Sequence, residues 1–245
     1  MNKIDYHLHT TWCNHADYSI EEVIIIMIEK KYKKIAITEH IPFQNNPRKD
    51  RMNFKNINKF LNLLCLLKKK YSKLIEIKVG FECEYLKNEL NYYKNLKKDK
   101  RVDFLMLGHH FSDKKINYFL VQNENEVIDY FYELSKAIET KLFLYIAHPD
   151  IILSNYFMTN KIECCINEFF KTYHDKIVFE VNCSGFLNKS KHYPNDEFWN
   201  IASRYKIKVC VNSDSHNKQD FLNDNISLGI AYAKERNLKI IDLFE

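Results

Sequence analysis

The sequence of 245 residues contains only four glycines, and they are dispersed along the chain. It therefore has neither the G-x-G-x-x-G pattern of dinucleotide-binding folds nor the G-x-x-x-x-G-K-[ST] phosphate loop. The G-x-S-x-G turn that carries a nucleophilic serine is absent as well. None of the five arginines lies six residues after a cysteine, which excludes the C-x5-R loop of thiol phosphatases. If the protein is an enzyme, a hydroxide bound to a metal ion is the simplest nucleophile that remains.

Seven cysteines are scattered through the chain, and no two of them have the spacing C-x-x-C. An odd number without paired spacing argues against a disulfide framework and against a zinc knuckle made of thiolates. We therefore interpret most of the cysteines as small, buried hydrophobic side chains.

Long apolar stretches are also missing. The longest, VIIIMI at residues 23–28, is too short to span a bilayer, and the first residues lack the apolar segment of a secretory signal. The formal net charge of +5 is mild, and the lysine clusters at 68–70 and 97–101 do not form one continuous stripe. We expect a cytoplasmic protein that binds a small phosphorylated molecule and contacts neither a membrane nor, by preference, nucleic acid. The sequence does not indicate an oligomeric state.

Short β-rich runs alternate with longer segments of helical periodicity, which predicts parallel strands in a barrel. At 245 residues and 46% hydrophobic composition, the chain can bury one large core. We expect a single α/β domain over residues 1–245. The predicted strands are 4–9, 34–38, 75–82, 103–107, 142–148, 177–182 and 209–213, and the clearest helical segments are 20–31, 56–70, 124–140, 162–173 and 197–205.

Metal-ligating residue types collect where these predicted strands end. In a barrel of parallel strands the carboxyl ends of the strands converge on one face, so these side chains are expected to meet. A single histidine at a strand end is more often structural than a ligand, but the joint placement favours a metal site. Gly80, Gly108 and Gly185 also lie near these strand ends. The set is His7, His9, His15, His40, Glu82, His109 or His110, His148, Asp214 and His216.

The pattern His7-Leu8-His9 is the strongest local signal, because residues two apart on a strand share a face and can hold one cation. Asp214-Ser215-His216 repeats the spacing after the last predicted strand, which becomes the neighbour of the first when a barrel closes. The donors are nitrogen and oxygen, so zinc, manganese and iron all fit.

Other polar residues are predicted to support these ligands. Glu39 and Glu84 are expected either to accept hydrogen bonds from ligating histidines or to lie at the surface, and Asp5 faces in the right direction to accept one from His7. Glu180 is a further candidate for the barrel interior. Spacing alone does not decide whether His109 or His110 faces inward.

The motifs DYHLHTTWCNH, ITEH, GFECEY, GHH, AHPD and NSDSH resemble those of the polymerase and histidinol phosphatase family, called PHP, from residue 4 to about residue 230. TEHIPF, GFECEY, EVNCSG and NSDSH are most similar to the stand-alone histidinol phosphatases of that family. The resemblance implies a distorted seven-stranded (β/α) barrel of the TIM-like kind with three divalent metal ions. It implies one ion at His7, His9, Glu82 and Asp214, a second at His15, His40 and His216, and a third at Glu82, His110 and His148.

The resemblance also implies the reaction, which is hydrolysis of L-histidinol phosphate to L-histidinol and phosphate by a metal-bound hydroxide in histidine biosynthesis. The predicted catalytic residues are His7, His9, Glu82, Asp214 and His216. The family's phosphatases often have a basic residue shortly after the motif that matches EVNCSG, whereas this sequence has no basic residue there before Lys189. The predicted substrate-binding residues are Arg48, His109, Lys189, Lys191 and His192.

Three other functions are compatible with these residues. The first is a PHP phosphoesterase acting on nucleotides, a phosphotyrosine protein or oligonucleotide ends. The second is a metal-binding module without hydrolytic activity, which the complete ligand set disfavours. The third is a carbon–nitrogen hydrolase of the amidohydrolase type. A carboxylated lysine would favour this function, and Glu82 in the bridging place argues against it.

Overall fold

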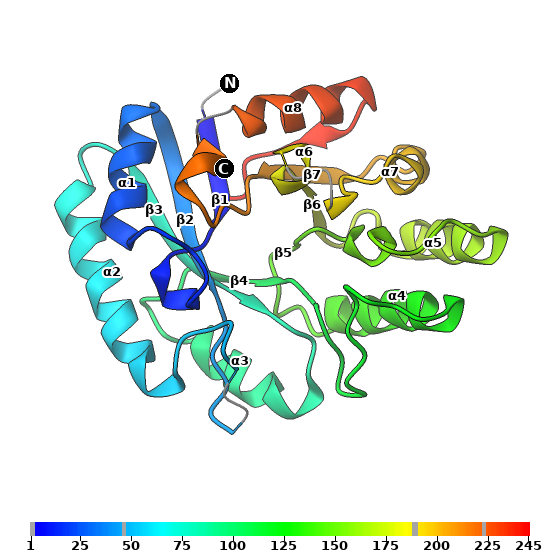
Figure 1. The fold of residues 1–245 in the computed structure, drawn as a ribbon, viewed down its shortest axis with the longest axis horizontal. Helices are drawn as coiled ribbons and strands as arrows, with labels where there is room; N and C mark the ends of the chain where they lie inside the picture. The colour runs from blue at the N-terminus through cyan, green and yellow to red at the C-terminus, as the bar shows by residue number, and fades with distance from the viewer. Residues whose placement is uncertain (1–2, 46–47, 188–190, 222–223) are drawn as a thin grey trace.

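The computed structural model describes residues 3–45, 48–187, 191–221 and 224–245. Their eight strands form one parallel sheet in which the strands follow one another in sequence order. The sheet is curled, and the helices lie outside it (Figure 1). The strands are β1 (Lys3–Leu8), β2 (Tyr32–His40), β3 (Glu76–Cys83), β4 (Phe104–Leu107), β5 (Tyr145–Ile146), β6 (Val178–Asn182), β7 (Lys208–Asn212) and β8 (Lys239–Ile240).

In the described residues, the two ends of the sheet are joined by a backbone bridge at the carboxyl end of β1. Leu8 forms an isolated parallel bridge with Ser215, just beyond β7, and the backbone N–H of His9 donates to the Ser215 carbonyl at 3.2 Å. β8 pairs instead with the amino-terminal part of β7, through Lys208 and Lys239. The sheet is therefore a distorted barrel that closes on the side where the strands end.

The helices cover the sheet with their apolar faces, and several begin at a side-chain cap. Ser19 and Glu22 form a capping box at the start of α1, and Asn123 and Thr159 cap α4 and α5 through backbone N–H groups. The helices are α1 (Ile20–Glu29), α2 (Ile57–Tyr71), α3 (Leu90–Leu96), α4 (Glu124–Glu139), α5 (Asn160–Tyr173), α6 (Ser184–Leu187), α7 (Asp196–Ala202) and α8 (Asn225–Glu235).

The interior of the barrel is divided into an apolar and a polar layer. A small apolar cluster between the strands includes Tyr6, Phe104, Met106 and Tyr145. Farther along the same strands the inward positions carry histidines and carboxylates, and most of these are buried. Alternation along each strand sends the intervening residues outward into the larger core beneath the helices. The polar layer thus lies at the carboxyl ends of the strands, as in other barrels of this type.

The prediction of seven strands is wrong, because the described residues form eight. The additional strand, β8, has two residues, which is too short to produce a readable alternation of apolar and polar side chains. The α/β architecture with parallel strands is confirmed. None of the described helices has the length and apolar character needed to cross a membrane.

Candidate metal centre

Glu82 lies at the centre of the polar layer, where its two carboxylate oxygens face different histidines. Oε1 lies 2.9 Å from Nε2 of His148 and 3.3 Å from Nε2 of His110. Oε2 lies 2.8 Å from Nδ1 of His40 and 3.3 Å from Nε2 of His9. The side chain is 1% exposed. A carboxylate with this geometry can bridge two cations, one through each oxygen.

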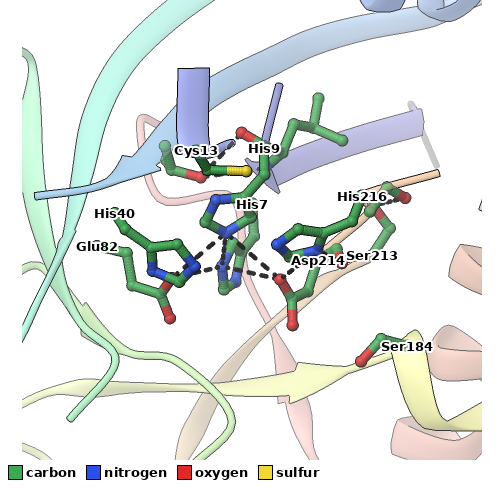
Figure 2. A network of polar contacts seen from close by, with 12 residues as sticks. His7, His9, Cys13, His40, Glu82, Ser184, Ser213, Asp214 and His216 are labelled. Carbon is green, nitrogen blue, oxygen red and sulfur yellow. Dashed lines mark hydrogen bonds and ion pairs between the residues drawn. The ribbon is translucent and has the colours of Figure 1, made fainter. Parts of the chain in front are cut away.

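Four potential donor atoms converge at the end of the barrel around the imidazoles of His7 and His9. Nε2 of His7 lies 3.1 Å from Nε2 of His9, 3.6 Å from Oε2 of Glu82 and 3.3 Å from Oδ1 of Asp214. The His9 nitrogen lies 3.3 Å from the Glu82 oxygen and 3.4 Å from the Asp214 oxygen. Donors bound to one zinc ion at about 2.0–2.2 Å are separated by about 3.3–3.6 Å. The five separations are close to this range, so one ion can be shared by His7, His9 and Asp214 with Glu82 beside them. Figure 2 shows these side chains pointing toward one another.

Three more imidazole rings surround this group. The His216 ring stacks on the His9 ring with 4.2 Å between centroids, and the His15 ring stacks on the His216 ring at 4.7 Å. The His40 ring lies 4.4 Å from that of His9. One nitrogen each of His9, His40 and His216 can come within reach of a common ion. All nine residues that the sequence predicts as ligands thus lie in one cluster, and their roles as ligands remain a prediction.

The carboxylates in this cluster are held in their charged form. Burial alone would raise the pKa of Glu82, but the imidazoles of His110, His40 and His7 hold it well below its usual range. Burial likewise opposes ionisation of Asp214, and the rings of His7, His9 and His216 hold its pKa well below normal. Two buried negative charges among many imidazoles form a site suited to divalent cations.

The outer nitrogens of two proposed ligands are fixed by buried carboxylates. Glu180 on β6 lies 2.9 Å from Nδ1 of His7, and Glu84 lies 3.0 Å from Nδ1 of His110. Such contacts set the tautomer and leave Nε2 free to face a metal. The sequence predicts Asp5 as the partner of the His7 ring. Asp5 instead accepts the backbone N–H groups of His7 and Ser213. The prediction for Asp5 is wrong in this respect.

A buried arginine that belongs to none of the sequence motifs supports Glu84. The Arg51 guanidinium is 2% exposed, lies 3.4 Å from Oε1 of Glu84 and donates to the Ile41 carbonyl at 3.0 Å. It also lies over the Phe43 ring at 5.0 Å. Arg51 therefore ties the loop after β2 to the acid that orients His110. No local spacing could have revealed it, because its partner is 33 residues away.

Glu84→Gln is expected to destabilise the metal-free protein in a pH-dependent way. Burial would raise the pKa of Glu84, but His110 and Arg51 lower it to about 2, against 4.5 in the unfolded chain. A depressed carboxyl pKa stabilises the folded state above pH 4.5, and this contribution is lost as the pH falls toward 2. Its full size is about 3 kcal/mol.

Urea unfolding of the metal-free protein can measure this contribution. The stability difference between wild type and Glu84→Gln should be large at pH 7 and should shrink steadily below pH 4.5. A difference that stays constant from pH 7 to pH 3 would show that charge on Glu84 contributes nothing.

The backbone at the rim is in the left-handed region at several site positions. The φ angles are 46° at His109, 31° at His148, 51° at Asp214 and 47° at His192, and none of these residues is glycine. This conformation costs free energy for side chains other than glycine and persists where surrounding contacts impose it. Contacts with the rest of the protein therefore hold the backbone in this conformation, which sets the direction of these four side chains.

A cavity of about 1050 Å³ opens onto the cluster. His15, His40, Glu82, His110, His148, Asp214 and His216 contribute to its wall. Lys191 and His192 line the same cavity, together with Phe119 and Tyr193. A small phosphate ester can thus reach the proposed metal ligands beside a basic side chain.

The other predicted substrate residues have different surroundings. Arg48 lies in an adjoining cleft, where its guanidinium pairs with Asp50 at 3.0 Å and covers the Phe111 ring at 4.3 Å. Lys189 lies outside the described residues.

The prediction that His109 contacts the substrate is wrong in this structure. His109 is fully buried, accepts the backbone N–H of Tyr85 at 3.1 Å and stacks on the Tyr130 ring at 5.7 Å. It does not line the cavity. Of the two adjacent histidines, His110 is the one that faces Glu82. His109 therefore packs the loop after β4 against α4.

Fold and site together define an α/β barrel with a cluster of potential metal ligands, and comparisons with known proteins give its family. Residues 5–184 match the model of the PHP domain, and the chain belongs to that family. A curated relative from Schizosaccharomyces pombe, described as "Probable histidinol-phosphatase", is 24% identical over 87% of this chain and 80% of its own length.

Solved structures share the fold. Histidinol phosphate phosphatase from Lactococcus lactis, in complex with zinc, L-histidinol and phosphate, superimposes with a TM-score of 0.78 at 17% identity, over 98% of this chain and 95% of that one. A chain of an archaeal ribonuclease P with mature tRNA gives a TM-score of 0.52 at 13% identity, over 96% and 91% of the two chains. At these identities the likeness concerns the fold, and the substrate has to be argued from the site.

Proposed function

We propose that this protein hydrolyses L-histidinol phosphate to L-histidinol and phosphate with the help of bound divalent cations. The observation that carries the proposal is that Glu82 and Asp214 both lie 3.3–3.6 Å from the His7 and His9 nitrogens, while the second oxygen of Glu82 faces His110 and His148. The name of the yeast relative and the ligands of the Lactococcus structure support this substrate. We expect the protein to work as a single domain.

Three cation positions are proposed from the arrangement of donors. The first is His7, His9, Glu82 and Asp214, the second is His15, His40 and His216, and the third is Glu82, His110 and His148. Cations held there would neutralise the phosphoryl oxygens. They would also lower the pKa of a bound water molecule, so that hydroxide would be available to attack phosphorus near neutral pH. The zinc in the Lactococcus structure supports zinc, and manganese and iron also suit these donors.

The residues of the chain have separate tasks in this scheme. Glu180 and Glu84 hold the imidazoles of His7 and His110 in one orientation, so the donor atoms are in place before substrate arrives. Lys191 lies on the cavity wall and contributes to the low pKa of Asp214, which indicates that its charge is close to the cluster. It is therefore the described basic residue best placed to attract the phosphate.

A phosphate-release assay tests the proposed substrate. Protein reconstituted with zinc or manganese is compared on L-histidinol phosphate, nucleoside monophosphates, a phosphotyrosine peptide and a 5′-phosphorylated oligonucleotide. We expect kcat/KM to be highest for L-histidinol phosphate and turnover to stop after chelation of the metal. A higher kcat/KM for one of the other substrates would assign the protein to that substrate instead. Turnover that survives metal removal would overturn the metal-dependent mechanism.

Lys191→Ala is expected to raise KM for L-histidinol phosphate by about 10- to 150-fold, with a smaller fall in kcat. The reason is that one charge-assisted hydrogen bond to the phosphate is worth about 1.5–3 kcal/mol in a shielded pocket. Steady-state kinetics of Lys191→Ala and the control Lys191→Arg can measure this effect, and the arginine variant should retain most of the binding. An unchanged KM in the alanine variant would move the phosphate contact to another residue.

A further inference from the structure

The thiol of Cys13 lies inside the histidine cluster, although the sequence predicts most cysteines to be simple core residues. Cys13 ends the short 3-10 turn η1 (Thr11–Cys13) that follows β1, and it is fully buried. Its backbone carbonyl lies 2.8 Å from Nδ1 of His15. The turn therefore holds the cysteine and His15 together, and of the two only His15 lines the cavity.

The surroundings of this thiol differ from those of the other buried cysteines. The thiols of Cys83, Cys183 and Cys210 each lie within hydrogen-bonding distance of a backbone carbonyl, those of Phe81, Val181 and Phe179. Over the described parts of the chain, the Cys13 thiol has no backbone carbonyl as partner. Its neighbours are instead the groups that can hold cations, and Figure 2 shows its sulfur beside the His9 ring.

Two sets of potential ligand atoms include Cys13. With His15 and His216, its sulfur belongs to a group in which all the ligand atoms lie within 4.8 Å of one another. A second such group joins it to His9 and Glu39. Among the described residues, Nε2 of His216 in the first group has no hydrogen-bond partner, and neither have Nδ1 of the fully buried His9 and Oε2 of Glu39 in the second, which lie 3.9 Å apart. Unpaired buried donors and acceptors around one thiol indicate a missing partner at this place.

We propose that the Cys13 sulfur is a ligand of the second cation, together with His15 and His216. The inference rests on the proposed metal cluster and adds a thiolate to donors that are otherwise nitrogen and oxygen. The sulfur–metal bond forms as the thiol releases its proton to solvent, so no oxidant or reductant is needed. A soft thiolate favours zinc over manganese. The second position should therefore be the most zinc-selective of the three.

Cobalt(II) reports directly on sulfur ligation. When metal-free wild-type protein is titrated with cobalt, we expect a thiolate-to-cobalt charge-transfer band in the near ultraviolet as well as the visible bands of nitrogen and oxygen ligation. Cys13→Ser should lose the near-ultraviolet band and keep visible bands. Cys65→Ser, which removes an exposed thiol on α2, should retain both. Zinc X-ray absorption of the wild type should show a sulfur neighbour at about 2.3 Å.

Metal affinity gives a second readout. Competition with a chelator should show that Cys13→Ser weakens zinc at one position by about 10-fold or more, whereas manganese affinity changes far less. Wild-type protein that binds cobalt without any charge-transfer band would overturn the role of Cys13, and this result needs no variant to fold. Wild-type protein that binds no cobalt at all would instead refute the proposed metal cluster. An unaltered cobalt spectrum in Cys13→Ser would assign the sulfur signal to another cysteine and overturn the inference.

Discussion

Glu82→Gln is expected to lower kcat/KM for L-histidinol phosphate by about 10³-fold or more and to reduce the metal content at the same time. Removing a residue that only supports a metal ligand typically costs 10–100-fold, and Glu82 is proposed to ligate two ions directly. The substitution replaces the charged oxygen that lies 2.8 Å from His40 and 3.3 Å from His9. It also halves the negative charge that Glu82 and Asp214 together offer to cations.

Elemental analysis and phosphate-release kinetics on the same samples can measure both effects. Glu76→Gln is a matched control, because Glu76 begins the same strand, is 46% exposed and pairs with Lys78 at 2.8 Å on the surface. The control should match wild type in metal content and in kcat/KM. If Glu82→Gln kept its full metal content and its kcat/KM stayed within 10-fold of wild type, the bridging role of Glu82 would be refuted.

Much of the fold could be predicted because each of the first seven strands contains a local pattern. The helix at 20–31 in the sequence corresponds to α1, and the segment 124–140 corresponds to α4. β5, in contrast, has only the two residues Tyr145–Ile146 where the sequence predicts a run of seven, although Leu144 and Ala147 on either side still donate backbone hydrogen bonds to Leu105 and Leu107. α3 has seven residues, too few for a clear helical period.

The position of the site could be predicted from one physical rule, whereas the pairing of each ligand with its supporting residue could not. Since parallel strands end on the same face, the spacing of histidines and acids predicts a cluster without knowledge of any contact. Which residue supports which ligand depends on pairs far apart in sequence. Glu180 reaches His7 across 173 residues, and no local pattern distinguishes it from Asp5.

Neighbouring positions can also have opposite environments that spacing does not reveal. His109 and His110 are adjacent, yet one stacks on Tyr130 in the core and the other faces Glu82. The separation depends on the left-handed backbone at His109, which turns the chain between the two rings. Such a conformation is imposed by tertiary contacts, so a single sequence gives little warning of it.

Gly108→Ala is expected to reduce kcat/KM by about 10²-fold without removing any proposed ligand. A Cβ atom at Gly108 would collide with the Oε1 atom of Glu82 and would lie 2.6 Å from its Cγ. The flexible carboxylate would have to move away, and a displacement near 1 Å at a reacting centre typically costs about 10²-fold. Because Gly108 has an ordinary negative φ, alanine itself fits the backbone there. The substitution should therefore leave stability within about 1 kcal/mol of wild type.

Gly80→Ala separates this effect from a general disturbance of β3 and β4. A Cβ atom at Gly80 would lie 2.7 Å from Cζ of the buried Phe104 ring, in the apolar layer below the metal centre. Overpacking of a core typically costs about 1–3 kcal/mol, so this variant should unfold at a lower temperature yet bind metal and turn over substrate nearly as wild type does. The two glycine variants thus have opposite expected profiles, one defective in turnover and the other in stability. If Gly108→Ala instead lost stability while its metal content and kcat/KM stayed normal, the contact with Glu82 would be a matter of packing, and the carboxylate would not need its present position for catalysis.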